Sequence, residues 1–171
     1  NGDYLLQQGD PAYDVQRAYT GLKLRERKRP LPGAETAIRE VRILGRALGI
    51  AFKLESVELP PDADPSERLR DLMVEGGYRI FLLDLPVAWV RRLASDFAGE
   101  DVVLFNIRHR DTDLRQENCG ASLFHTIPSL DMHSDALAQF LAARDWRRIL
   151  VLEGEAEADK CAWVCRYYAE Q

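Results

Sequence analysis

Short apolar runs that alternate with longer amphipathic stretches limit the possible folds of this chain more than any other feature. Runs of strand length, rich in Val, Ile, Leu and Phe, lie at residues 4–8, 50–59, 78–85, 102–107, 122–126 and 147–153. Stretches with helical spacing lie between and after them, at residues 34–48, 65–74, 86–97, 129–143 and 156–168. This alternation is typical of β-α units that feed a parallel sheet. We therefore predict an α/β fold of three αβα layers, a mostly parallel sheet with helices on both faces.

Several local signals place the ends of these elements. Asp64 precedes Pro65 in the order expected of a helix cap and a first helical residue, and Ser129 is placed to cap the helix that runs to about residue 143. Gly49 follows the apolar periodicity of residues 34–48 and is expected to end that helix. Residues 80–83 are continuously apolar, which predicts a strand buried on both faces in the middle of the sheet.

Composition narrows the class of protein. The chain has 171 residues, the usual size of one domain, and 46% of them are apolar. Charged residues of both signs are mixed and sum to a net charge of −5, so the basic footprint of a nucleic-acid binder is missing. No stretch approaches the roughly 20 apolar residues of a membrane span. A single domain over residues 1–171, with no nucleic-acid partner and no membrane span, is the expectation.

Two further features concern cysteines and a basic run. The three cysteines include Cys161 and Cys165, four residues apart on one predicted helix, where a mutual bridge is disfavoured. Buried thiols are expected, and a bridge from Cys119 to either one stays open for an oxidising compartment. No His lies near them, so a metal site is disfavoured.

The basic residues within 14–32, together with Pro30 and Pro32, predict an extended excursion with a solvated face.

Candidate functional residues follow the strands, because an open parallel sheet binds ligands beyond the carboxyl ends of its strands. The polar, apolar and aromatic residues at these points are Asp10, Tyr13, Asp84, Leu85, Asn106, Arg108, His109, Asp111, His125, Thr126 and Ser129. They contain no convincing nucleophile and base held by a third group, and G-x-S-x-G is absent. The glycine-rich motifs that cradle nucleotide phosphates are also absent. We therefore expect neither an enzyme nor a bound cofactor or metal.

The order of elements also carries a family resemblance. It rests on "DPAYDVQRAYTGLKLRERKRPLPGAETAIREVRILGRALG" at 10–49, "FLLDLP" at 81–86, "LFN" at 104–106 and "LFHTIPSLDMHSDALAQFLAARDWRRILVL" at 123–152. The chain resembles the amino-terminal lobe of type I periplasmic substrate-binding proteins, which serve ABC transporters of the branched-chain amino acid class. More narrowly, it is similar to the branch associated with PQQ-dependent alcohol dehydrogenase systems. The resemblance implies a noncatalytic, periplasmic lobe that binds a small molecule.

The sequence departs from the amino-acid-binding members of that family. They place a small hydroxyl residue after the third strand and a small residue with Thr after the fourth, where this chain has Asp84-Leu85-Pro86 and Asn106-Ile107-Arg108. The ligand contacts that we predict are Asp10, Tyr13, Asp84, Asn106, His109 and Ser129. One lobe forms only half a cleft, so a second lobe, a second protomer or an ABC permease is the expected partner. The alternative is a standalone flavodoxin-like module that binds a protein.

Overall fold

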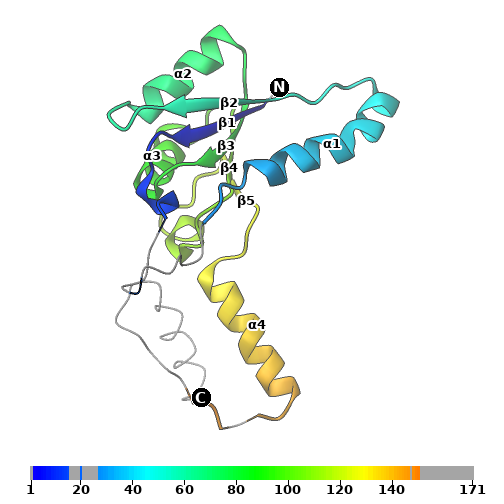
Figure 1. Ribbon diagram of the computed structural model, residues 1–171, viewed down its shortest axis with the longest axis vertical. Helices are drawn as coiled ribbons and strands as arrows, with labels where there is room; N and C mark the ends of the chain where they lie inside the picture. Colours follow the sequence, from blue (N-terminus) through cyan, green and yellow to red (C-terminus); the bar gives the residue numbers. More distant parts are fainter. Residues whose placement is uncertain (1, 16–19, 21–26, 147, 151–171) are drawn as a thin grey trace.

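Five parallel strands form one sheet in the computed structural model, which describes residues 2–15, 20, 27–146 and 148–150. The strands are β1 (Gly2–Gln7), β2 (Leu54–Leu59), β3 (Ile80–Asp84), β4 (Val103–Asn106) and β5 (Leu123–His125). Their order across the sheet is β2-β1-β3-β4-β5, and every neighbouring pair is parallel (Figure 1). The predicted α/β class and the central position of β3 are both confirmed.

Within the described residues, four α-helices and two short 3-10 helices lie between and after the strands. The α-helices are α1 (Leu31–Leu48), α2 (Pro65–Glu75), α3 (Val87–Asp96) and α4 (Leu130–Ala143), and the 3-10 helices are η1 (Pro11–Tyr13) and η2 (Thr112–Arg115). Helices α2 and α3 lie together on one side of the sheet, and α1 lies on the other side (Figure 1). Helix α4 leads away from the carboxyl end of β5.

The capping signals in the sequence are confirmed. The Asp64 side chain accepts hydrogen bonds from the backbone amides of Ser66 and Glu67 at the start of α2. The Ser129 hydroxyl accepts one from Met132 N at 3.2 Å at the start of α4. Gly49 ends α1 with a φ of 68°, a left-handed conformation that glycine adopts without the steric cost of a side chain.

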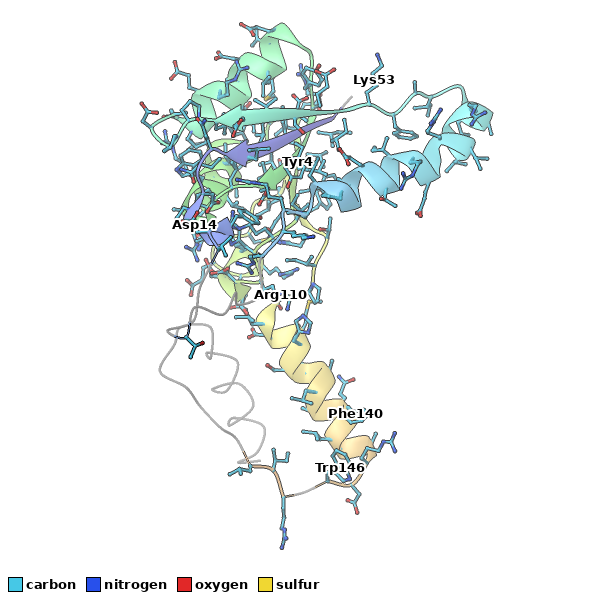
Figure 2. The ribbon with its side chains drawn as sticks, viewed as in Figure 1. Tyr4, Asp14, Lys53, Arg110, Phe140 and Trp146 are labelled. Carbon is cyan, nitrogen blue, oxygen red and sulfur yellow. The ribbon has the colours of Figure 1, made fainter. Side chains whose placement is uncertain are left out.

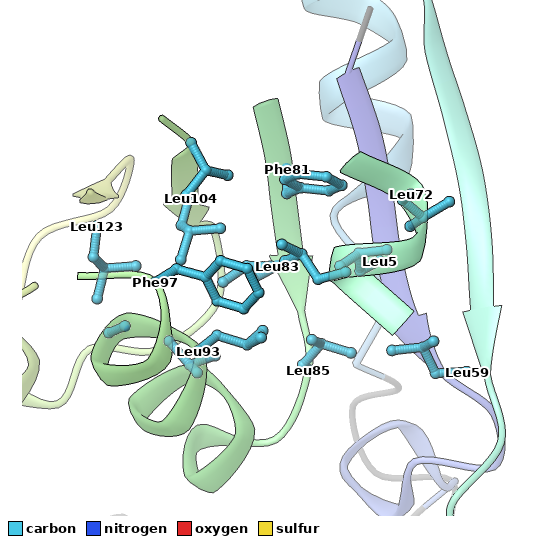
Figure 3. Close-up of a cluster of buried hydrophobic side chains, with 14 of the residues drawn as sticks. Leu5, Leu59, Leu72, Phe81, Leu83, Leu85, Leu93, Phe97, Leu104 and Leu123 are labelled. Atoms are coloured by element: carbon cyan, nitrogen blue, oxygen red, sulfur yellow. The ribbon is translucent and has the colours of Figure 1, made fainter. Parts of the chain in front are cut away.

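The hydrophobic core lies between the sheet and the helices α2 and α3. Leu5, Phe81, Leu83 and Leu104 point from successive strands toward these helices, and each is fully buried (Figure 3). The helices contribute Leu69, Leu72, Val90 and Leu93 to the same cluster. Burial of one such side chain contributes about 1.5 to 3 kcal/mol, so this layer is the most stable part of the domain.

The opposite face of the sheet is covered less completely. Ile80 and Phe124 remain 41% and 51% exposed there. Helix α1 leaves Ile43, Leu44 and Leu48 exposed, and Gly45 is its one buried residue. The outer layer on this side therefore packs more loosely than the layer formed by α2 and α3.

Some predicted boundaries are wrong. Residues 50–53 lie before β2 rather than within it, and α1 begins at Leu31 because a proline is tolerated in the first turn of a helix. Residues 148–150 form no strand, although a strand is predicted over 147–153. The rest of that range, the helix predicted over 156–168 and both Cys161 and Cys165 lie outside the described residues. Cys119 is described and is exposed.

Candidate ligand-binding edge of the sheet

Parallel strands bring their carboxyl ends to one edge of the sheet, and loops of the predicted site gather there. The strand order places the topological switch point between β1 and β3, because the chain moves outward in opposite directions from these two strands. Asp10 follows β1 and Asp84 ends β3, so the two carboxylates flank this point. Figure 2 labels Asp14 and Arg110 at the same end of the domain.

Asp84 is the centre of a buried polar network. Its side chain is completely buried, and its Oδ2 accepts hydrogen bonds from Tyr4 Oη at 2.8 Å and from Arg29 Nη1 at 2.9 Å. Its Oδ1 accepts from the Tyr13 hydroxyl, and Arg108 Nη1 lies 3.4 Å from it. Burial first, and then the hydrogen bond to Asp84, raise the pKa of both tyrosines, which keeps them protonated donors. Both carboxylate oxygens are thus occupied within the protein.

Asp10 forms the second ion pair of this network. Arg108 Nη1 lies 2.5 Å from Asp10 Oδ2, and the Arg108 side chain is 8% exposed. Burial raises the pKa of Asp10, but hydrogen bonds from Arg108 and from Ala12 N outweigh burial, so the net shift is downward. The guanidinium groups of Arg29 and Arg108 lie 4.4 and 4.9 Å from the centre of the Tyr13 ring, in cation–π contact. Two carboxylates and two guanidiniums neutralise one another here.

Arg29 belongs to this network, contrary to the sequence-based expectation. It belongs to the basic run that was expected to be a solvated face, but its Nη1 binds Asp84 and its Nη2 donates to Gln7 O at 2.7 Å. The Arg29 side chain is 26% exposed. No local signal distinguishes it from its basic neighbours, because its acidic partner lies 55 residues away in the sequence.

Asn106 holds the loop that follows β4. Its Oδ1 accepts from the backbone amides of Arg108 and His109, at 3.2 and 2.8 Å. Its Nδ2 donates to His109 O at 2.7 Å and lies 3.0 Å from His125 Nδ1, which is the acceptor. All four hydrogen-bonding positions of the amide are satisfied. Asn106 is fully buried and fixes the loops after β4 and β5 relative to each other.

The surroundings of two histidines at this edge favour the neutral form of the imidazole. His109 Nε2 donates to Leu85 O at 2.6 Å, and burial, followed by the charge of Arg108, lowers the pKa of His109. Burial and the charge of Arg115 lower the pKa of His125. His109 Nδ1 lies 3.8 Å from Asp111 Oδ2. Across the described ranges, no group of three or more His, Cys, Asp or Glu side chains is placed to hold a metal ion.

A hollow lies beside the last strand of the sheet. It measures about 460 Å³ and is lined by Arg115, Leu123, Phe124, His125, Thr126, Ile127, Pro128 and Met132. Arg115 Nη2 donates to Ile127 O, whereas its Nη1 is buried without a hydrogen-bond partner. Most of this lining is apolar, and Arg115 is its one full charge.

The structure brings the six predicted contact residues to the carboxyl end of the sheet by named contacts or strand position. Asp10, Tyr13 and Asp84 belong to the ion-pair network, and Asn106 and His109 form the adjacent loop. Ser129 lies beyond β5, where its hydroxyl caps α4. Asp10, Asp84, Asn106 and Ser129 are buried and use their polar atoms within the protein, whereas Tyr13 and His109 are partly exposed. Their contact with a ligand stays a prediction.

Comparison with known proteins supports the fold. A scan against family models and a search of curated proteins found no match. Among solved structures, the chain is similar to an ABC transporter substrate-binding protein from Desulfitobacterium hafniense, with a TM-score of 0.61 and 17% identity. It is also similar to a structure from the same organism described as that kind of protein in complex with Leu, with a TM-score of 0.58 and 18% identity.

Each of these matches covers 99% of this chain and 46% of the other chain. The chain therefore spans less than half the length of these neighbours, and its fold is that of one lobe of a substrate-binding protein. These neighbours are transport proteins rather than enzymes. No helix within the described ranges is both long and apolar enough to cross a membrane.

Proposed function

We propose that this chain is a solute-binding lobe of an ABC-type uptake system and binds a small molecule at the carboxyl edge of its sheet. The observation that carries the proposal is the fold likeness over 99% of the chain to one lobe of substrate-binding proteins. The position of the polar loops at the β1/β3 switch point supports it, because ligands of open α/β sheets bind at such points.

In this proposal the predicted contact residues have two roles. Asp84, Asn106 and Ser129 hold the loops and the start of α4 in place, since their polar atoms are satisfied internally. Tyr13 and His109 are partly exposed and contact the ligand, and Asp10, whose carboxylate is held by Arg108, supports the same edge beside them. Tyr13 presents a ring already flanked by two guanidinium groups.

The proposal includes a partner and a compartment. A single sheet edge buries a small ligand on one side, so a second lobe or a second protomer closes over it, and an ABC permease receives the ligand. The periplasm is the proposed compartment. Thiol counting on denatured, unreduced protein tests this placement: one free thiol rather than three is expected if Cys119 is bridged, and three free thiols remove this support.

A thermal-shift screen tests the function. The ligands are leucine, other amino acids, small carboxylic acids, alcohols, quinones and metal ions, at millimolar concentrations because half a cleft binds weakly. A ligand that binds the native state raises the melting temperature, and the rise grows with the logarithm of its concentration once this exceeds the dissociation constant. If no small molecule raises it while a defined protein partner does, the solute-binding role is wrong and the interaction module replaces it.

A further inference from the structure

The hollow beside β5 is lined by Arg115, an arginine without a counter-charge among the described residues. Arg115 makes no ion pair with any carboxylate of the described residues, and its one hydrogen bond there is to the carbonyl of Ile127. Arg29 and Arg108, by contrast, are paired with Asp84 and Asp10. Arg115 and His125 both line the hollow, so the guanidinium lies at its polar part.

The lack of a partner at Arg115 is energetically unfavourable in the free protein. Its Nη1 is buried without any hydrogen-bond acceptor, and buried polar groups of native proteins are nearly always satisfied. A guanidinium binds a carboxylate with charge-assisted hydrogen bonds, which are stronger than those to a neutral carbonyl. Because Arg115 lines the hollow, an anionic ligand there would supply the missing counter-charge.

The rest of the hollow determines the shape of such a ligand. Leu123, Ile127, Pro128 and Met132 contribute apolar surface, and Met132 is 53% exposed. The volume of about 460 Å³ falls within the roughly 300 to 1,000 Å³ of small-molecule sites. A small carboxylate with a compact apolar body fits a pocket that has one cation and an apolar wall.

We infer that the hollow beside β5 binds a small organic acid, with Arg115 holding the carboxylate and the side chains of Ile127 and Met132 contacting the apolar body. This inference rests on the proposed function, since it names the ligand class at the same sheet edge. It places the ligand's charge at β5 rather than at the neutral network around Asp84.

Titration with isocaproate, followed by amide NMR shifts, tests the inference. Isocaproamide, its uncharged counterpart, is the matched ligand. We expect isocaproate to bind at millimolar concentration and to shift the amides of residues 123–132, and isocaproamide to bind at least tenfold more weakly. Equal binding of the two compounds would overturn the inference, because the positive charge of Arg115 would then contribute nothing to ligand binding.

Two pairs of variants test whether Arg115 supplies the positive charge that binds isocaproate. Arg115→Gln is expected to weaken isocaproate binding at least tenfold, and Arg110→Gln, which changes an exposed arginine of the same end, is expected to change it less than twofold. In case Arg115→Gln impairs folding, Met132→Glu and Met132→Lys change an exposed lining residue instead. Glu is expected to weaken binding and Lys to strengthen it. Unchanged binding in both Met132 variants and in a folded Arg115→Gln would contradict the inference.

The outcomes separate this inference from the proposed function. If isocaproate fails to bind while another ligand of the thermal-shift screen binds, the inference is wrong and the solute-binding role stands. If isocaproate binds with the expected dependence on Arg115, both are supported. If no ligand binds at all, the proposed function fails together with the inference.

Discussion

The two ends of the candidate ligand-binding edge differ in how their charged side chains are paired. Around the β1/β3 switch point, Asp84 and Asp10 meet Arg29 and Arg108, and every carboxylate oxygen of Asp84 has a donor. Beside β5, Arg115 has a carbonyl acceptor and no described counter-charge. A neutral network stabilises loops and has little to gain from a ligand, whereas an unpaired cation gains from an anion. The comparison separates residues that build the edge from residues that can recognise a ligand.

Removal of Asp84 is the strongest test of the network. Asp84→Ala leaves two guanidiniums and two tyrosine hydroxyls without their shared acceptor, and breaking a buried ion pair costs about 3 to 5 kcal/mol. We expect a loss of that size in the free energy of unfolding, measured by urea denaturation. Asp62→Ala, at an exposed turn position, is the control and should change stability by less than about 0.5 kcal/mol. Similar effects of the two variants would show that the network has no structural role.

Removal of each tyrosine hydroxyl in turn compares how much the two donors to Asp84 contribute to stability. Tyr4→Phe removes a donor to a fully buried carboxylate, which we expect to cost about 1 to 3 kcal/mol of unfolding free energy. Tyr13→Phe should cost less, because Tyr13 is half-buried and water can replace its hydroxyl. Urea denaturation of both variants gives the order. A larger effect at Tyr13 would contradict the placement of Tyr4 in the buried part of the network.

The pH dependence of stability tests the environment of the two histidines. Their pKa values are lowered in the folded protein, so the unfolded chain binds more protons as the pH falls through the unfolded value of about 6.5. The contribution of these two neutral histidines to the free energy of unfolding is therefore complete above that pH and is lost below it. We expect the free energy of unfolding to fall from pH 7.5 to 5.5, by at most about 1.4 kcal/mol per pH unit for each additional proton bound.

Substitution of these histidines separates them from other titrating groups. The double variant His109→Gln and His125→Gln should flatten the pH dependence between 7.5 and 5.5. His133→Gln, at an exposed histidine of α4, is the control. Carboxylates such as Asp10 act in a lower window, since the lowered pKa of Asp10 maintains its contribution until the pH falls below about 3.9. A pH profile unchanged in the double variant would refute the assignment to the histidines.

The smallest expected effect is at the start of α4, next to the hollow. Ser129→Ala removes the cap, at a cost of about 1 kcal/mol. Because α4 leads away from the sheet, we expect faster hydrogen exchange at the first turn of α4 rather than a large change in global stability. Ser129→Thr, which retains a hydroxyl, should restore slow exchange. Unchanged exchange in Ser129→Ala would show that the cap does not hold this turn.

Local chemistry explains which parts of the fold were predictable. The run at 80–83 gave the central strand, and Asp64, Ser129 and Gly49 gave helix ends, because each signal acts within a few residues. The boundaries of α1 and β2 were less well predicted, since periodicity alone does not locate the first turn of a helix or the first pair of a strand.

The positions of the site residues at the ends of strands were predictable, but their hydrogen-bonding and ion-pair partners were not. The rule that strands of a parallel sheet end at one edge identified Asp10, Asp84 and Asn106. It did not reveal that Arg29 pairs with Asp84 across 55 residues, or that the amide of Asn106 is satisfied within its own loops. These contacts depend on how the loops meet in space. The isolation of Arg115 is equally a tertiary property, and the sequence analysis did not single out this residue.

Amide NMR mapping of a bound carboxylate tests the central claim most directly. We expect isocaproate to shift the amides of residues 123–132 and of the neighbouring loop at 106–111, all at the carboxyl edge of the sheet. Shifts confined to the opposite edge, at Gly2, Leu54 and Ile80 where β1, β2 and β3 begin, would contradict it.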